Sequence, residues 1–464
     1  MAITIDIEPE RNALVSTLLP IYYKCTEATA DTTNLVAKCF WIDQTTLVET
    51  QVGGEYRLAP SLENSDEFKF DASEIFNSLT KYTLEDMPSI RVGEKVNTLS
   101  NTLINWKDVA TWYVKVKFYR EYLDSTTGLI VLDPSPEVSE PYYVHEGCPD
   151  QQWLTTAVET NGGNNYSVFK YFRGDYDSLD SYKRWLTNTP MSSYNHSVNI
   201  DQNESYIVNF FAPLQTTGHV YRIQIKTYDI SDTLLNTHEL TPTESNNLQT
   251  FMCGFRDIKN GLTEGGTESS GFANVEYYKV YFNASSNTSA PYTYDISLSI
   301  YTFHVKRKCL GKGYLRFAFK NMLGGFDMVT SNGKFTKTSK SKLETYEQSL
   351  GYLNWNNPMK FGGQNWATEE TVEYRVVTEP MKRENAEHFA EMFNSTNVYL
   401  REKSFPFGSV YSVPLKADTS DIYPYVYNPI QMLAGTATLY ETTNQLVQLK
   451  FKFIQAVNQR TPRY

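Results

Sequence analysis

The sequence predicts a mainly β protein, with β-sandwich-like domains in series and a few short helices. Its 34 Tyr and 25 Phe favour strands, because aromatic side chains pack well on a pleated surface. Helical periodicity is confined to two short segments. Alternation with period 2 is clearest where Trp112, Val114, Val116 and Phe118 alternate with Tyr113, Lys115, Lys117 and Tyr119.

Three domains are expected along the chain. Residues 1–141 are predicted to form an N-terminal β-sandwich, residues 142–305 a middle β-sandwich, and residues 306–464 a C-terminal β-rich domain with one helix at about 384–395. The proline-rich, polar stretch 132–141 marks the first boundary, because such sequences form turns and extended connections. The chain shows no fixed-period repeat of the solenoid or propeller kind.

The individual elements follow from hydrophobic spacing and turn residues. A helix near 71–79 would begin with Asp71 and Glu74 at capping-box spacing. The helix at 384–395 would bury Phe389, Met392 and Phe393. Strands are expected at 15–25, 34–43, 112–119, 205–211, 220–228, 276–282, 295–305, 398–402, 411–415 and 445–454.

Residues 309–336 are predicted to form one β-hairpin that organises the C-terminal domain and shares a sheet with the strand at 446–454. Residues 321–325 supply the turn, and Gly325 is expected to adopt a positive φ. The alternation restarts at Phe326. The first strand would bury one face, formed by Leu315, Phe317 and Phe319 and alternating with Arg316, Ala318 and Lys320.

This hairpin resembles a recurring segment in tail proteins of phages of Bacteroidota, including the crAss-like group. There, an aromatic-leucine-x-phenylalanine strand precedes an asparagine and a Gly-Gly-Phe/Trp-Asp turn. The helix start at 68–75 and the closing segment that runs into Ala456 are similar to the same proteins. The positions that match in the hairpin are Tyr314, Leu315, Arg316, Phe317, Asn321, Gly324, Gly325, Phe326, Asp327 and Phe335.

The resemblance implies a structural virion protein of a phage tail. Such a protein would be a hub or adaptor that joins the tail to fibres or to a neighbouring ring through protein–protein interfaces. Its partners would be fibre, ring or hub subunits and further copies of itself in a symmetric homo-oligomer. It would be assembled in the bacterial host cytoplasm and reside in the virion tail. The alternative is a receptor- or glycan-binding tail fibre adhesin, with a host glycan as its partner.

Charge and hydropathy exclude some partners. The net charge of −11 argues against nucleic acid, because phosphate contacts need clustered Lys and Arg. The local lysines Lys334, Lys337, Lys340 and Lys342 are interpreted as a solvated hairpin flank or a subunit contact. No run of about 18 apolar residues occurs, so no membrane insertion is expected. The N-terminus shows no secretory signal.

The five cysteines are widely scattered, without a Cys-x-x-Cys spacing that would bind zinc. We interpret them as small core residues of a protein assembled in a reducing compartment. They are Cys25, Cys39, Cys148, Cys253 and Cys309.

No catalytic, cofactor-binding or metal-binding residue is expected, and the protein is predicted not to be an enzyme. The six histidines lack metal-ligand spacing, and neither a phosphate loop nor a nucleophile elbow occurs. The acidic group at 175–180 departs from a calcium loop at two positions. Trp355 and Trp366 are candidate surface aromatics that would stack on sugars or plug the ends of a sandwich. A glycosidase is kept as a third alternative. Its two catalytic carboxylates need no fixed spacing in the sequence, because the fold sets their separation.

Overall fold

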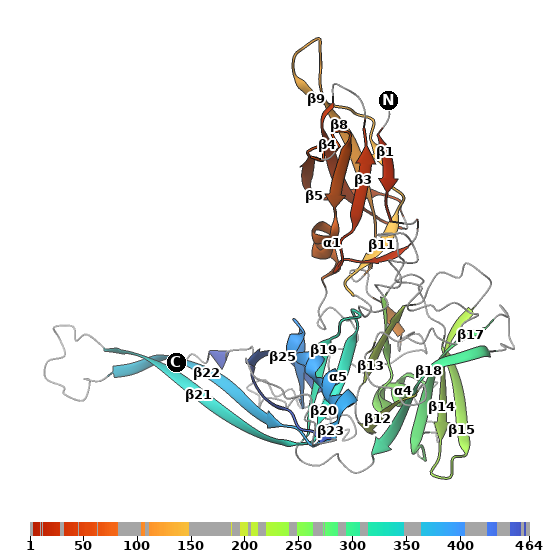
Figure 1. Cartoon of the computed structure of the whole chain (residues 1–464). Coiled ribbons are helices and arrows are strands. Elements are labelled where there is room, and N and C mark those ends of the chain that lie inside the picture. Colours follow the sequence, from red (N-terminus) through yellow and green to blue (C-terminus); the bar gives the residue numbers. More distant parts are fainter. Residues whose placement is uncertain are drawn as a thin grey trace. The chain divides into compact units, whose positions relative to one another are not determined.

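The structure is a computed structural model of the whole chain (Figure 1). It describes residues 3–9, 11, 13–27, 32–44, 46–62, 64–81, 104–106, 111–147, 187, 195–202, 206–211, 220–240, 248–262, 272, 274–285, 294–306, 314–347, 363–403, 425–433, 446–455 and 459–460. These residues form several β-sheets and a few short helices. The predicted fold class, mainly β with serial sandwich-like domains, is therefore confirmed.

The chain divides into two compact units. The first comprises Met1–Arg307 together with Asn321–Asp327, and the second comprises Lys308–Lys320 together with Met328–Tyr464. The turn at the centre of the predicted 309–336 hairpin thus belongs to the first unit. Most of the two strands that flank this turn belongs to the second unit.

The first unit begins with two sheets around one apolar core. The smaller sheet has the order β1(Thr4–Ile7), β3(Tyr22–Thr26), β6(Glu67–Asp71). The larger sheet has the order β2(Leu14–Ser16), β11(Tyr142–His145), β8(Thr111–Leu123), β4(Thr32–Ile42), β5(Glu49–Leu58). Strands β9(Ile130–Leu132) and β10(Glu137–Val138) also pair with β8.

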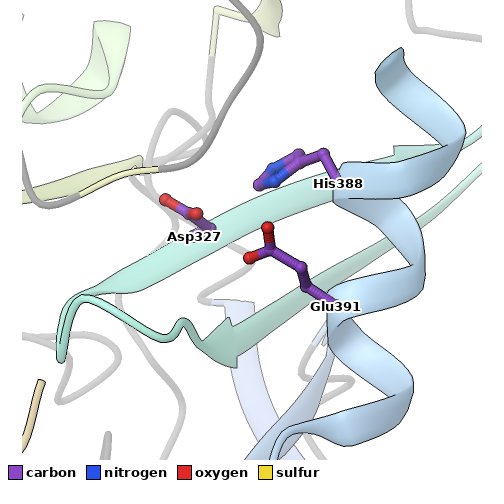
Figure 2. Close-up of side chains that lie close together, drawn as sticks. All are labelled: Asp327, His388 and Glu391. Atoms are coloured by element: carbon purple, nitrogen blue, oxygen red, sulfur yellow. The ribbon is translucent and has the colours of Figure 1, made fainter. Parts of the chain in front are cut away.

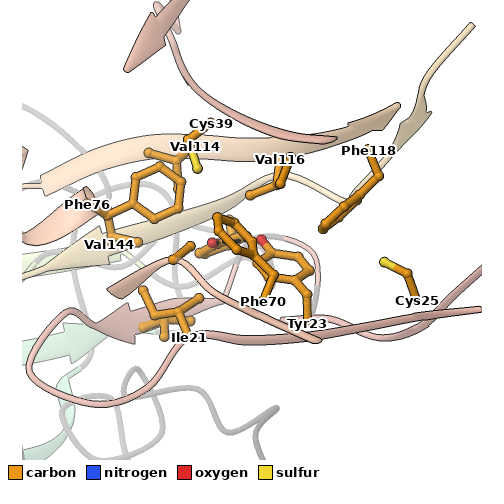
Figure 3. Packing of buried hydrophobic residues seen from close by; sticks show 14 of the residues in the cluster. Ile21, Tyr23, Cys25, Cys39, Phe70, Phe76, Val114, Val116, Phe118 and Val144 are labelled. Atoms are coloured by element: carbon orange, nitrogen blue, oxygen red, sulfur yellow. Dashed lines mark hydrogen bonds between the residues drawn. The ribbon is translucent and has the colours of Figure 1, made fainter. Parts of the chain in front are cut away.

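Aromatic side chains from both sheets fill this core (Figure 3). Tyr23 of the smaller sheet contacts Phe118 of the larger one at a ring-centroid distance of 5.5 Å. The Tyr23 hydroxyl donates a hydrogen bond to the Tyr142 hydroxyl at 2.8 Å, so both buried phenols have a polar partner. Strand β8 buries Val114, Val116 and Phe118 in alternation, which confirms the predicted amphipathic strand.

Two local predictions in this region are wrong. The strand expected at 15–25 is split into β2 and β3, which lie in different sheets. Pro20 lies between them, and proline can neither donate to a ladder nor continue most strands. Helix α1(Ser73–Thr80) begins after Ala72 without a side-chain cap. Instead, Asp71 Oδ1 accepts hydrogen bonds from the backbone N–H groups of Ser73 and Ile21, at 2.9 and 3.0 Å.

The middle of the first unit holds two further sheets and helix α4(Phe255–Gly261). Their facing side chains are aromatic: Phe210 and Phe282 come from different sheets and their ring centroids lie 5.1 Å apart. The three-stranded sheet has the order β13(Ile207–Phe211), β16(Leu248–Met252), β7(Ile104–Trp106). The five-stranded sheet has the order β12(Asn195–Asp201), β18(Tyr294–Lys306), β17(Tyr277–Ser285), β14(Val220–Tyr228), β15(Leu234–Leu240). The four strands predicted in this region correspond to β13, β14, β17 and β18.

The second unit is built on one eight-stranded sheet. Its main order is β20(Phe326–Ser331), β19(Leu315–Lys320), β24(Val398–Lys403), β25(Tyr425–Leu433), β27(Lys450–Gln455), β22(Gly363–Val377), β21(Lys334–Glu347). Strand β28(Gln459–Arg460) also pairs with β22. In a separate short ladder, β23(Met381–Lys382) pairs with β26(Leu446–Val447), and helix α5(Arg383–Asn394) follows β23.

Phenylalanines form the centre of the second core. Phe317 of β19 contacts Phe389 of α5 and also Phe451 and Phe453 of β27, with ring-centroid distances of 6.2, 5.8 and 5.4 Å. The predicted hairpin strand and the C-terminal strand therefore share a sheet, as expected. The predicted helix is confirmed as α5, which buries Phe389 and Met392. Phe393, also expected to be buried, is only partly buried.

Two predictions in this unit need correction. All six residues of β19 are buried, whereas one buried face was expected. Arg316 is only 2% exposed, and its Nε donates a hydrogen bond to the Thr330 hydroxyl at 2.9 Å. The strand expected at 445–454 is interrupted between β26 and β27, and Leu449 N–H donates instead to the Thr378 hydroxyl at 2.9 Å. Residues 411–415 lie outside the described residues.

The three described cysteines are core residues, as predicted. Burial raises the thiol pKa of Cys25 and of Cys39 to about 12, and raises that of Cys253 well above its usual value.

Since the thiolate is the reactive form, we expect native Cys25 and Cys39 to react with iodoacetamide at pH 8 more than about a hundredfold slower than in the unfolded chain. Peptide mass spectrometry after timed labelling measures both rates. Equal rates would contradict the burial of these thiols. Cys148 and Cys309 lie outside the described residues.

Candidate functional site

The turn between β19 and β20 is closed by Asn321. Its backbone N–H donates to the Gly325 carbonyl at 2.9 Å, and its carbonyl accepts from Gly324 N–H at 3.1 Å. Its side-chain Oδ1 also accepts from Gly325 N–H at 3.0 Å. The predicted turn is thus present. Asn321 closes it through its side-chain amide oxygen, as asparagine commonly does in turns.

The positive φ predicted for Gly325 belongs to its neighbour. Gly324 has φ +85°, and Gly325 is not among the described residues with positive φ. The sequence offers two adjacent glycines, and either can take the left-handed conformation. The hydrogen bonds of Asn321 select Gly324 for it.

Two glycines allow the turn to approach residues 146–147 of the same unit. A Cβ atom on Gly324 would lie 2.2 Å from the Glu146 carbonyl oxygen. A Cβ atom on Gly147 would lie 2.2 Å from the Leu323 carbonyl oxygen. Two backbone segments that are far apart in the sequence therefore touch with no room for a side chain at either glycine.

The residues after the turn continue this contact. The Phe326 N–H donates to Oδ1 of Asn209 in β13 at 2.7 Å. Phe326 and Asp327 are 1% and 3% exposed. The turn is thus held in the first unit by backbone packing and by a buried hydrogen bond.

Most of the predicted motif residues are buried. Leu315 and Phe317 of β19, with Asn321, are buried. Phe335 lies on β21, which pairs with β22 and not with the hairpin, and it is 37% exposed. Trp355 lies outside the described residues. Trp366 lies in β22, but its side chain is outside the described residues.

Two titratable side chains of helix α5 lie near each other. His388 and Glu391 lie one turn apart and project from the same side of this helix (Figure 2). His388 is 6% exposed, and the centroid of its ring lies 5.6 Å from that of Phe319. Asp327, also drawn in Figure 2, belongs to the first unit. We assign no metal site to these residues.

The outer face of the five-stranded sheet combines tyrosines and lysines, which the sequence analysis did not single out. Tyr228 of β14 and Tyr277 of β17 stand opposite each other, with ring centroids 4.8 Å apart and ring planes at 7°. Lys279 lies over both rings, at 5.4 and 5.8 Å from their centroids. Lys226 lies over the ring of Tyr281 at 5.1 Å. The signal in the sequence was the alternation of Lys and Tyr in the predicted strands 220–228 and 276–282.

Two of these phenols are hydrogen-bonded to neighbouring side chains. Burial and a hydrogen bond with Asp232 raise the pKa of Tyr277 to about 12. Burial and the neighbouring Tyr228, to which it is hydrogen-bonded, raise the pKa of Tyr281 as well. Both phenols are therefore neutral at physiological pH and can donate or accept hydrogen bonds.

Strands β8 and β9 form a hairpin (Figure 1), and apolar side chains near its turn are exposed. Leu123, Leu129 and Ile130 are 49%, 65% and 60% exposed. Asp124 closes the turn: its Oδ1 accepts from Thr126 N–H at 2.9 Å, and its N–H donates to the Leu129 carbonyl at 2.9 Å. This apolar tip is a candidate interface, because a turn already closed by hydrogen bonds loses less entropy on binding than an open loop.

Comparisons with known proteins add no family. No family model and no curated protein matches the chain. Among solved structures, trypsin-activated alpha-2-macroglobulin from Escherichia coli is similar at 8% identity and TM-score 0.18 over 82% of this chain and 20% of that one. A point mutant of Salmonella alpha-2-macroglobulin matches at 8% identity and TM-score 0.14 over 100% and 34% of the two chains. This chain thus spans a fifth to a third of their length.

In the part of the chain that the structure describes, no helix is long and apolar enough to span a membrane.

Proposed function

We propose that the chain is a non-enzymatic structural protein of a phage tail, a hub or adaptor that joins the tail to fibres or to a neighbouring ring. It acts through protein–protein interfaces as one of several symmetric copies. The proposal rests on the structural role of the residues that match the tail-protein motif. Leu315, Phe317, Asn321, Gly324 and Phe326 form buried packing and a closed turn.

This placement matters because a shared motif of active-site residues would face a cleft and present polar groups to a substrate. The motif here instead fixes backbone conformation and fills a core. A pattern of this kind indicates a shared architecture, as expected if the resemblance reflects a shared structural role. The sandwich-like domains in series agree with a protein whose work is mechanical and associative.

The tip formed by Leu123, Leu129 and Ile130, which we call the β8–β9 tip, is the surface we propose for contact with another tail subunit. A few well-packed residues near the centre of an interface carry most of its binding energy. Leu123 and Ile130 stand directly opposite each other in the register of β8 and β9, so one substitution disturbs the whole tip.

We expect Ile130→Glu to lower incorporation of the protein into phage particles at least tenfold, since a desolvated interface residue contributes about 2 kcal/mol or more. Immunoblotting of particles from phage carrying the variant measures incorporation. Leu62→Glu is the matched control, because Leu62 is a fully exposed leucine elsewhere on the same sandwich. Both variants should keep the wild-type melting temperature. Normal incorporation of Ile130→Glu would exclude this surface.

A further inference from the structure

The turn between β4 and β5 holds a leucine in the left-handed backbone conformation. Leu47 has φ +57°, and the other described residues with positive φ are glycines and one aspartate, Asp232. Glycine adopts this conformation without strain and aspartate tolerates it, whereas a bulky apolar residue seldom does. Leu47 is also 73% exposed, and Val48 after it is 58% exposed. The backbone is therefore strained at a position where the side chain gains little burial within this chain. We call these two residues the β4–β5 tip.

The turn between β8 and β9 has the same backbone hydrogen bonds but a glycine at the equivalent position. Leu47 N–H donates to the Asp43 carbonyl at 2.8 Å, and Gly128 N–H donates to the Asp124 carbonyl at 2.7 Å. Each aspartate N–H also donates to the carbonyl of the residue that follows Leu47 or Gly128, at 3.0 and 2.9 Å. Gly128 has φ +67°. The same sandwich thus forms this turn with glycine, so the backbone does not require a leucine at position 47.

The β4–β5 tip and the β8–β9 tip lie at opposite ends of the N-terminal sandwich. The antiparallel register of β4 and β8 pairs Trp41 with Val114 at one end and Thr32 with Tyr122 at the other. The β4–β5 tip follows the end of β4, and the β8–β9 tip lies at the end of β8. A head-to-tail contact between copies of a chain needs two different surfaces on each copy. Two apolar tips at opposite ends of one domain meet this requirement.

We propose that the β4–β5 tip of one copy packs against the β8–β9 tip of the next copy, with Leu47 as the anchor residue of this contact. The inference rests on the proposed function, in which several symmetric copies act together, and it names the partner of the β8–β9 tip. Burial of Leu47 against Leu129 and Ile130 removes apolar surface from water on both copies. The carboxylates of Asp43 and Asp124 accept N–H groups of their own turns. Leucine therefore contributes binding energy that glycine at this position would not.

Two other partners fit the β4–β5 tip less well. Anionic lipid surfaces attract clustered basic side chains, and Lys115 and Lys117 beside this turn both pair with Glu49, at 2.5 and 2.6 Å. A symmetric contact between two β4–β5 tips would leave the β8–β9 tip of both copies exposed. The head-to-tail contact covers both tips.

Cysteine cross-linking of the purified full chain tests the contact. Leu47→Cys and Ile130→Cys are treated with a short bis-maleimide, singly and as an equal mixture. We expect a cross-linked dimer in the mixture and no dimer above background in either variant alone, because each copy then carries one half of the contact. Mass spectrometry should locate the cross-link at positions 47 and 130. The wild type gives the background from the native cysteines, of which the three described are buried.

Leu47→Gly separates the side chain from the turn. Because it gives this turn the glycine found at Gly128, the melting temperature should equal or exceed that of the wild type. Self-association, measured by sedimentation over a concentration series, should weaken at least tenfold, since an anchor residue is lost. Leu62→Gly is the matched control and should leave self-association unchanged, because Leu62 is a fully exposed leucine elsewhere on the same sandwich.

Four results would overturn this contact. They are absence of the mixed cross-link, a cross-link in Leu47→Cys alone, unchanged self-association of Leu47→Gly, and a fall in the melting temperature of that variant. If washed particles still contain the chain, such a result refutes the head-to-tail contact and leaves the tail role in place. Absence of the chain from particles would instead refute the tail role.

Discussion

Gly324→Ala is expected to destabilise the first unit by about 2–5 kcal/mol. A non-glycine residue in the left-handed region costs about 1–2 kcal/mol, and Gly324 has φ +85°. The added Cβ would also lie 2.2 Å from the Glu146 carbonyl oxygen, and forced overpacking costs about 1–3 kcal/mol more. Both costs fall on backbone that cannot move without breaking the turn. Urea denaturation measures the total.

Two other glycines separate these contributions. Gly128 has φ +67°, but the position that a Cβ atom would occupy there is open space, so Gly128→Ala should show the conformational cost alone, about 1–2 kcal/mol. Gly54 has open space and no positive φ, and Gly54→Ala should change stability by less than about 0.5 kcal/mol. If Gly324→Ala costs no more than Gly128→Ala, the close approach of the turn to residues 146–147 is wrong.

Phe317→Ala is expected to destabilise the second unit by about 3–5 kcal/mol, the usual cost of deleting a fully buried phenylalanine. Phe317 is 0% exposed, and it is the residue through which β19, α5 and β27 meet. Its removal leaves a cavity bounded by Phe389, Phe451 and Phe453. Rigid sheet backbone on one side limits how far the site can collapse.

The measurement is hydrogen exchange, followed in β19 and β27 as denaturant is added. Phe335→Ala is the matched control, because Phe335 is 37% exposed and contacts Tyr374 at the edge of the sheet. It should cost less than about 1.5 kcal/mol, since a large part of its ring stays in water. Equal losses of protection in the two variants would show that Phe317 is not central to this core.

Elements with one buried and one solvated face could be predicted from sequence. The strand expected at 220–228 is β14(Val220–Tyr228), and the alternation in β8 marks its buried face correctly. The helix expected at 384–395 differs from α5(Arg383–Asn394) by one residue at each end. In these elements the hydrophobic period carries the information that decides burial.

The prediction failed where tertiary contacts decide. Arg316 is buried although it lies on the polar positions of β19, because it finds a partner in Thr330. The choice between Gly324 and Gly325 rests on the hydrogen bonds of Asn321. Lys226 and Lys279 meet only through the register of two strands far apart in sequence. No local pattern encodes such a register.

The central claim, that the chain is a structural part of a phage tail, is tested most directly by quantitative mass spectrometry of washed particles. The account predicts that the chain is present at a fixed copy number relative to the major capsid protein, as a closed ring of subunits requires. It also predicts that the purified protein hydrolyses no host polysaccharide. Absence from the particles, or robust hydrolysis of a glycan by the pure protein, would contradict it.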